Sequence, residues 1–237
     1  MYQCQKEFNQ IQINNLEQLY KSHGIGYLTY FDAEYPDLLR EIYNPPLILF
    51  YKGNIKLLTQ KALAIVGARD ANYYGRQVLN KIIPPLIEKE MVIVSGLAKG
   101  IDTFAHMATI ENRGQTIAVL GGGFFHIYPK ENDSLAKEIA LKHLLLSEYP
   151  PIERPAKWKF PMRNRIISGL TQGTLVVQAK ERSGSLITAD FALEQGREVF
   201  AIPGNITDVL SGGTNDLIQQ GAKLVMNANH IIEELNV

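Results

Sequence analysis

Short apolar runs alternate with amphipathic stretches from Lys61 to the end of the chain. The apolar runs are a few residues long and rich in β-branched side chains, and they lie at 62–66, 91–95, 116–120, 174–179 and 198–202. Continuous apolar runs of this length are typical of strands buried on both faces of a parallel sheet. The stretches between them have helical spacing, at 75–90, 101–112, 131–141 and 186–196. This alternation predicts a doubly wound α/β domain with a mostly parallel sheet and right-handed crossovers.

The first sixty residues follow a different pattern. A weak helical stripe over residues 16–20 precedes two proline-containing segments and the apolar run 47–51, after which Lys52-Gly53-Asn54 reads as a turn. We therefore expect residues 1–55 to form a short N-terminal appendage, first helical and then extended. Residues 56–237 are expected to form the α/β domain.

Composition narrows the class of protein. The 237 residues are 46% hydrophobic, with 24 basic and 24 acidic side chains, which argues against a disordered chain. The single cysteine, Cys4, excludes an intrachain disulfide and a cysteine-based metal site. The first ten residues lack the apolar core of a signal peptide, and no apolar run is long enough to span a membrane. We expect a cytoplasmic protein without membrane contact.

Positive charge is concentrated between Glu153 and Arg165. Five basic residues stand against the single acid Glu153, and the rings of Trp158 and Phe160 lie among them. This composition is typical of a surface that binds a polyanion and stacks its bases. A helix starting at Arg163, Asn164 and Arg165 would direct its free N–H groups and two guanidiniums at one phosphate. The alternative is a solvated loop before a helix, with both rings as core anchors.

Glycine-bearing turns follow the first three predicted strands. Ligands of open parallel sheets bind beyond the carboxyl ends of the strands, so these turns are candidates for phosphate contact. The candidate residues are Gly67 and Arg69, then Ser95, Gly96 and Lys99, then Gly121 and Gly122, with Lys130 shortly after. The alternative is that glycine is common in such turns and that a single lysine is a surface charge. No dinucleotide or P-loop fingerprint is present, so no nucleotide cofactor is predicted.

A Ser183-Gly184-Ser185 turn precedes the last predicted helix. Either serine could cap this helix, and its N-terminus would then add a further anion-facing group to the same edge. Simple capping is the alternative. His106 and His126 lack the spacing of a metal site or a catalytic triad and are interpreted as structural. Asp102 and Glu148 are the only acid/base candidates near the loops, and neither has an evident partner. No catalytic or metal-ligating residue is predicted.

Ten motifs in order identify the chain with a known family. It resembles the DprA/Smf DNA-processing family from about Tyr35 to Gly221. The motifs are YPDLL at 35, NPPLILFYKG at 44, AIVGAR at 64, VSGLAKGID at 94, YPKEN at 128, SEYPP at 147, FPMRNRIISGL at 160, SGSLITADFALEQGR at 183, AIPGN at 201 and GA at 221.

The resemblance implies an extended Rossmann-like domain that binds single-stranded DNA without base preference and forms a homodimer. It further implies that the protein protects incoming strands and loads the RecA recombinase onto them during natural transformation. The basic pocket of the family carries over to Arg69, Lys130, Arg163 and Arg165. We expect the dimer contacts over residues 206–221.

Two features depart from the family pattern. Only about thirty residues precede the YPDLL motif, and the chain stops soon after the α/β pattern. We therefore expect a truncated N-terminal helical domain with a linker and no C-terminal winged-helix domain. Gln178 stands where the family is expected to have a glutamate, which weakens any hydrolytic interpretation. The alternative function is a nucleoside-monophosphate phosphoribohydrolase, a related Rossmann-like enzyme, but its PGGxGT turn and neighbouring catalytic glutamate are missing.

Overall fold

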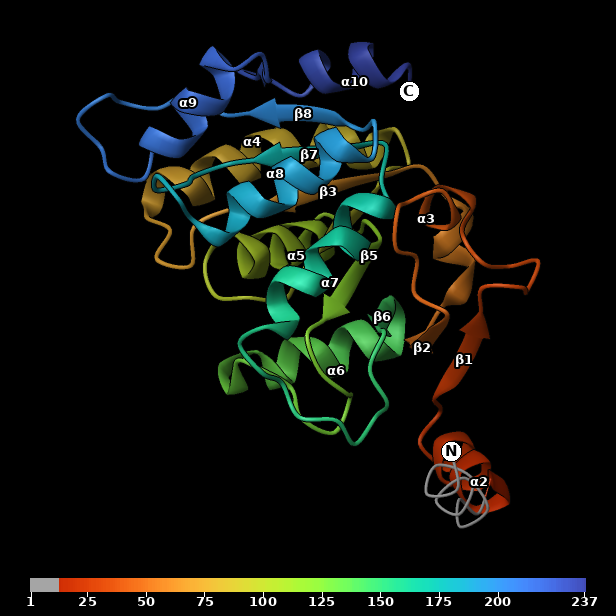
Figure 1. Ribbon diagram of the computed structural model, residues 1–237. Coiled ribbons are helices and arrows are strands. Elements are labelled where there is room, and N and C mark those ends of the chain that lie inside the picture. Colours follow the sequence, from red (N-terminus) through yellow and green to blue (C-terminus); the bar gives the residue numbers. More distant parts are fainter. Residues whose placement is uncertain (1–12) are drawn as a thin grey trace.

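A nine-stranded sheet forms the centre of the molecule (Figure 1). The computed structural model describes residues 13–237, so Cys4 lies outside the described residues. The strand order is β1-β2-β6-β5-β4-β3-β7-β8-β9. The last seven strands of this order, from β6 to β9, run parallel to one another, whereas β1 and β2 are antiparallel to their neighbours. The strands are β1 Gly26–Thr29, β2 Ile48–Gly53, β3 Ala62–Val66, β4 Val92–Ser95, β5 Thr116–Leu120, β6 Leu144–Ser147, β7 Gly173–Val176, β8 Glu198–Ala201 and β9 Lys223–Leu224.

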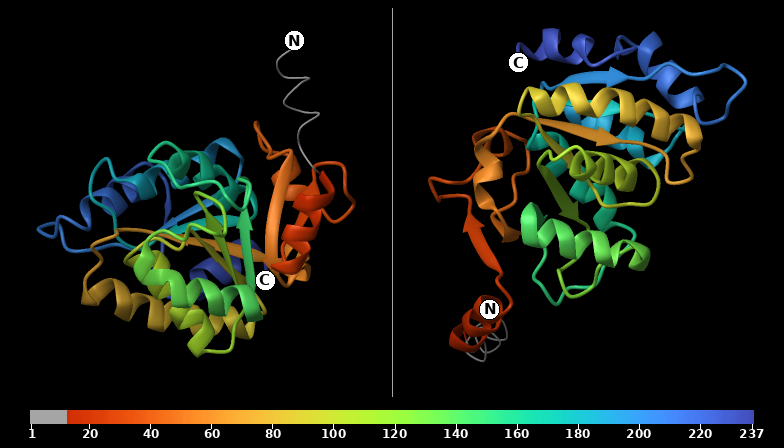
Figure 2. Two further views of the ribbon diagram at one scale, coloured as in Figure 1. Left: turned by 90° about the horizontal axis from the view of Figure 1, so that it is seen from below. Right: turned by 180° about the vertical axis from the view of Figure 1, so that it is seen from behind.

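Helices cover both faces of the sheet (Figure 2). Buried side chains of α4, α5 and α10 form the core of one face, with α6 packed beside them, and those of α3, α7, α8 and α9 form the core of the other. The α-helices are α2 Ile13–Ser22, α3 Asp37–Arg40, α4 Tyr73–Glu88, α5 Ile101–Glu111, α6 Asp133–Lys142, α7 Lys159–Gly169, α8 Gly184–Glu194, α9 Gly212–Gln219 and α10 Asn229–Leu235. Two 3₁₀ helices complete the described chain, η1 Ile55–Thr59 and η2 Lys130–Asn132.

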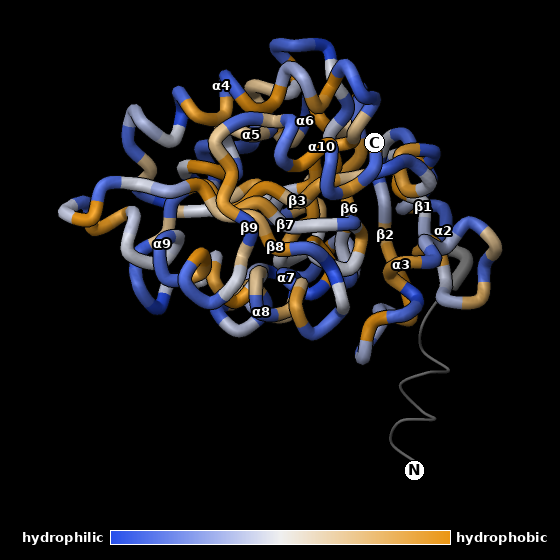
Figure 3. Tube along the Cα trace, turned by 90° about the horizontal axis from the view of Figure 1, so that it is seen from above, coloured by the Kyte–Doolittle hydropathy of each residue, from blue (hydrophilic) through white to orange (hydrophobic). Residues whose placement is uncertain are grey.

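Successive residues of the central strands point to opposite faces of the sheet and so contribute to both hydrophobic cores. In β3, Ala64 and Val66 join the core under α7 and α8, whereas Leu63 and Ile65 join the core under α4 and α5. All five residues of β3 are buried, as expected for a central parallel strand. The apolar strands lie inside a shell of more hydrophilic helices and loops (Figure 3).

The order of strands reverses direction at β3. The chain passes from β3 through α4 to β4 on one side, and later returns to place β7 on the other side. The connections leaving the carboxyl ends of β3 and β7 therefore lead to opposite faces, through α4 and α8, which opens a crevice at this point of the sheet. The fold thus predicts a ligand site beyond Val66.

The doubly wound fold is confirmed, and the five predicted strands correspond to β3, β4, β5, β7 and β8. The sequence patterns did not indicate β1, β6 or β9. β2 pairs with β6, placing Phe50 opposite Ser147, so β1 and β2 extend the same sheet although they precede residue 55. Among residues 13–237, no helix has both the length and the apolar character needed to cross a membrane.

Candidate functional site

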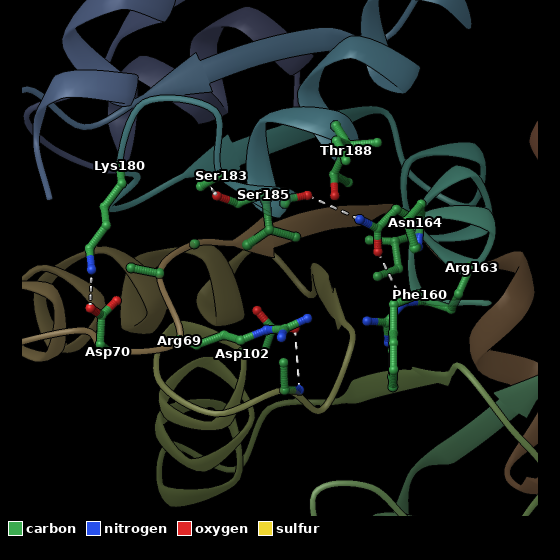
Figure 4. A pocket seen from close by; sticks show the side chains of 18 of the residues that line it. Arg69, Asp70, Asp102, Phe160, Arg163, Asn164, Lys180, Ser183, Ser185 and Thr188 are labelled. Carbon is green, nitrogen blue, oxygen red and sulfur yellow. Dashed lines mark hydrogen bonds and ion pairs between the residues drawn. The ribbon is translucent and has the colours of Figure 1, made fainter. Parts of the chain in front are cut away.

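A cavity of about 530 Å³ opens at the carboxyl ends of β3 and β7 (Figure 4). Its wall comes from the loop after β3, the start of α5, the segment entering α7 and the start of α8. The side chains that define its chemistry are Arg69, Asp70, Asp102, Tyr128, Lys157, Phe160, Arg163, Asn164, Lys180, Ser183, Ser185 and Thr188. The structure thus brings together, at one edge, side chains from segments more than a hundred residues apart.

Arg69 and Lys157 are exposed cations on this wall. The Arg69 guanidinium carbon lies 5.9 Å from the centroid of the Phe160 ring. Within the described residues, no carboxylate lies at ion-pair distance from either cation. Both charges are therefore available to an anion that enters the cavity.

Phe160 lies at the boundary between the cavity and the end of β5. Its ring packs against the Tyr128 ring with centroids 5.5 Å apart. A Cβ atom on Gly121 would lie 2.7 Å from this ring, so only glycine fits there. Gly122 is restricted in the same way by the backbone of Pro155, at 2.9 Å. The two glycines therefore make room for the segment entering α7, and neither lines the cavity.

Arg163 forms the floor of the cavity and is almost completely buried. Its Nη1 donates hydrogen bonds to the carbonyl oxygens of Gly96, at 2.5 Å, and Val119. A Cβ on Gly96 would lie 2.4 Å from the guanidinium carbon, which explains the glycine. Burial lowers the pKa of Arg163 to about 10, against the opposing effect of nearby Asp102. Arg163 thus remains charged at neutral pH but is bonded to strand-end carbonyls.

Asp102 is the buried counter-charge of Arg163. Its Oδ2 accepts hydrogen bonds from the N–H groups of Gly96, at 3.1 Å, and Ala98, at 3.4 Å. Burial raises the pKa of this carboxyl group, while Arg163 and the two N–H donors act in the opposite direction. The carboxylate therefore closes the loop between β4 and α5.

The N-terminus of α8 faces the cavity. Ser183 occupies the N-cap position, but its Oγ pairs with Ser185 Oγ at 2.8 Å and does not cap the helix. Asn164 Nδ2 donates to the carbonyl oxygen of Gly184 at 3.2 Å, which fixes this turn against α7. First-turn N–H groups have no acceptor within their own helix and carry partial positive charge. This end of α8 is suited to a phosphate.

Lys180 and Asp70 were not predicted as site residues. They form an ion pair of 2.5 Å across the cavity mouth, and the hydrogen bond from Lys180 lowers the pKa of Asp70. Lys180 follows β7 closely, so the strand-end rule that selected Arg69 would also have found it. Lys157 is one of the five basic residues between Glu153 and Arg165, and it lines the cavity although it is not among the predicted site residues.

Several predicted residues lie outside the cavity wall. Ser95 is buried and donates its hydroxyl hydrogen to the carbonyl oxygen of Ile65 at 2.6 Å. Lys99 is exposed and forms an ion pair with Glu131 at 2.6 Å. Lys130 and Trp158 are exposed but do not line the cavity. The eight predicted residues that the structure does gather there are Gly67, Arg69, Phe160, Arg163, Asn164, Ser183, Gly184 and Ser185.

Arg165 also lies away from the cavity. It is buried and forms an ion pair of 2.6 Å with Glu148, which supplies the partner that the sequence did not reveal for Glu148. The expectation that a helix begins at Arg163 is wrong, because α7 begins at Lys159. Pro161 falls in its first turn, where a missing N–H breaks no helical hydrogen bond. Arg163 and Arg165 are therefore helix-interior residues that project in different directions.

Two further residues have structural roles. Gln178 is buried, and its side-chain amide exchanges hydrogen bonds with Asn72 at the start of α4, at 2.9 and 3.2 Å. His106 is buried with its Nδ1 2.7 Å from Thr116 Oγ1. Over the described part of the chain, no three His, Cys, Asp or Glu side chains are grouped as a metal ion would require.

Comparison with known proteins places this geometry in a family. The sequence profile described as DNA recombination-mediator protein A matches residues 26–236. DNA processing protein DprA of Bacillus subtilis is 54% identical over 217 residues, which span 91% of this chain and 73% of that protein. The X-ray structure of DNA processing protein A from Streptococcus pneumoniae superposes with a TM-score of 0.91 at 49% identity, covering 97% of this chain and 80% of that one.

A solved structure of DNA processing protein A from Helicobacter pylori is also similar, with a TM-score of 0.79 and 31% identity. The match covers 90% of this chain and 95% of that chain. The H. pylori structure is described as giving insight into a unique mode of binding single-stranded DNA.

Proposed function

The chain belongs to the DNA recombination-mediator protein A family, and from that premise we propose that it binds single-stranded DNA in the cavity at the ends of β3 and β7. The observation that carries the proposal is the position of exposed Arg69 above the Phe160 ring. Lys157 and the N-terminus of α8 line the same cavity. Guanidinium, ammonium and backbone N–H groups bind phosphate oxygens, and an aromatic ring stacks on a base.

The lining also supports binding without base preference. Asn164 is the only carboxamide among the residues that line the cavity, and both ends of its amide are already engaged. Its Nδ2 donates to Gly184, and its Oδ1 accepts from Arg163 Nε at 3.1 Å. To distinguish one base from another, a protein needs free hydrogen-bond donors and acceptors that face the edge of the base, whereas stacking on Phe160 tolerates every base. Sequence-independent binding is therefore the expected behaviour.

We propose that the protein has no catalytic turnover. A general base must have its carboxylate or imidazole within reach of the reacting proton. The Asp102 carboxylate accepts two backbone N–H bonds and is buried against Arg163, and Glu148 is paired with Arg165. Asp70, the other carboxylate that lines the cavity, is paired with Lys180. All three carboxylates are therefore engaged by protein groups, which argues against the phosphoribohydrolase alternative.

Strand protection and RecA loading are proposed from the family, as is a homodimer. Within the predicted dimer segment, residues 206–221, the side chains of Ile206 and Val209 are 92% and 69% exposed. Leu210 and Leu217, by contrast, are buried in the protomer itself. The dimer contact is therefore proposed to use the loop before α9. Two cavities on one dimer would raise the avidity for long strands without new contacts.

Competition binding tests the proposed function. A fluorescently labelled oligo-dT strand should raise its anisotropy on titration with the protein, and thymidine monophosphate at equal nucleotide concentration should displace little of it. Strand and monophosphate should both remain intact on incubation with magnesium, and RecA-driven strand pairing should accelerate. Equal competition by the monophosphate, or release of free base, would instead support a nucleotide enzyme.

A further inference from the structure

The indole of Trp158 lies near the cavity in sequence but does not line it. Its side chain is 62% exposed, although it directly precedes α7. Its chain neighbour Lys157 and Phe160, two residues further on, both line the cavity. Trp158 therefore lies at the rim, within one or two residues of the groups that would hold the strand.

Two buried or half-buried side chains hold the indole in place. The Lys159 Nζ lies 5.5 Å from the Trp158 ring centroid and 4.7 Å from that of Tyr149. Tyr149 and Trp158 meet edge to face, with centroids 6.1 Å apart and an interplanar angle of 85°. Cation–π and edge-to-face contacts of this kind orient an aromatic ring. The indole is thus supported from the protein side while much of its surface faces solvent.

The support beneath the ring is itself anchored. Lys159 is only 3% exposed, and its ammonium group pairs with the Glu153 carboxylate and donates to the carbonyl oxygen of Arg154 at 2.8 Å. The one carboxylate of this segment is therefore occupied by Lys159. Arg154 and Lys157, four residues and one residue before Trp158 in the sequence, are exposed cations without an ion-pair partner among the described residues. An oriented ring flanked by free cations is the arrangement that binds a nucleotide by stacking and phosphate contact together.

We infer that Trp158 is a second base-stacking subsite, outside the cavity. A strand bound in the cavity leaves over Lys157 and places one flanking base on the exposed indole. This inference rests on the proposed function, because the strand is held first by the cavity. Preorganisation of the ring by Lys159 and Tyr149 reduces the entropy lost when the base stacks.

Intrinsic fluorescence tests the inference directly, because Trp158 is the only tryptophan of the chain. Unlabelled oligo-dT should quench its emission, since a stacked base provides a decay path. An abasic strand of the same length carries the same phosphates without bases, and should bind while leaving the emission nearly unchanged. Binding of both strands is followed in parallel by the anisotropy of end-labelled copies.

Two variants sharpen the test. Trp158→Leu should weaken oligo-dT binding about tenfold and leave abasic-strand binding unchanged, because one base stack is lost. Trp158→Phe keeps a ring and should retain most of the affinity. Leu141→Ala is the control, since Leu141 is 80% exposed on α6.

The outcomes separate the two proposals. Oligo-dT binding with unchanged Trp158 emission, or with equal affinity in Trp158→Leu, would overturn the second subsite and leave the cavity proposal intact. Quenching of equal size by the abasic strand would also overturn it. A wild-type protein that binds neither strand would overturn both.

Discussion

Arg163 connects the carboxyl ends of β4 and β5 through its guanidinium. Removing it by Arg163→Ala leaves the carbonyls of Gly96 and Val119 without their donor and the Asp102 carboxylate buried without its counter-charge. Leaving a buried acceptor without its donor typically costs about 1–3 kcal/mol, and more where a charged group is involved. We therefore expect the free energy of unfolding in urea to fall by about that amount.

The double variant Arg163→Ala with Asp102→Asn is the control for this prediction. It removes the unpaired charge, so it should recover part of the loss. Equal stability of wild type and Arg163→Ala would show that Arg163 is not structural and that its charge serves the ligand alone.

His106 makes the free energy of unfolding depend on pH. Burial lowers its pKa from 6.5 to about 3, so between these values only the unfolded chain carries the extra proton. The stabilisation is complete above pH 6.5 and is lost as the pH falls toward 3. Neighbouring His143, whose pKa is also lowered by burial, acts in the same direction. His106→Asn should show a smaller loss of unfolding free energy over this range; a loss identical to wild type would contradict the assignment.

Residue identity alone did not separate the two arginines of the basic segment. Arg163 and Arg165 have the same charge and nearly the same neighbours in sequence, but residues two apart on a helix face different directions. The sheet decides that the Arg163 side chain reaches the strand ends and that the Arg165 side chain reaches Glu148. Arg69 could be placed correctly because it follows a strand with no helix between.

At the scale of elements, α8 contributes its N-terminus to the cavity. Gly184 is the first residue of the helix, is exposed, and has no atom within 4 Å of an added Cβ. Gly184→Asp should raise the melting temperature slightly, because a carboxylate favours the positive end of the helix. The same charge should repel phosphate and weaken binding of oligo-dT about tenfold.

Gly184→Asn is the matched variant for this prediction, with similar size and no charge. It should bind nearly as wild type does. Equal binding by the Asp and Asn variants would show that the α8 terminus does not contact the strand.

The hydrophobic pattern predicted strands accurately where a glycine-containing turn follows them. Gly67 and Gly96 follow β3 and β4, and both strands were found almost to the residue. β6 was missed because only Lys142 and His143 separate the predicted helix 131–141 from Leu144, and neither is a turn residue that would mark the start of a strand. α7 begins at Lys159, four residues before the predicted start. Pro161 suggested a later start because proline usually breaks a helix, but the first turn of a helix tolerates proline.

At the scale of the whole molecule, the sheet is wider than the sequence suggested. β2 pairs antiparallel with β6, which lies about a hundred residues further along the chain, and β1 pairs antiparallel with β2. Short strands of this kind carry a weak signal, and their pairing depends on tertiary context. The crevice at β3 was predictable in principle, because it follows from the strand order and the strand-end rule.

The proposed dimer can be tested by its mass. Ile206→Asp places a charge on an apolar side chain that is almost fully exposed in the protomer. If the loop before α9 forms the contact, this variant should be monomeric by light scattering at tens of micromolar, whereas wild type is dimeric. Leu141→Asp on α6 is the control and should stay dimeric. A dimeric Ile206→Asp protein would move the contact elsewhere.

If the cavity beyond β3 binds the phosphate backbone of single-stranded DNA, removal of Arg69 must change both the affinity and its salt dependence. Oligo-dT affinity is measured over a salt series for wild type, Arg69→Ala and Lys142→Ala, a control cation at the opposite edge of the sheet. Arg69→Ala should bind more weakly than wild type, and its slope of log affinity against log salt should be shallower by about 0.7, the value for one phosphate contact with a single strand. Lys142→Ala should match wild type. Unchanged affinity and slope in Arg69→Ala, at an unchanged melting temperature, would show that the strand does not bind in this cavity.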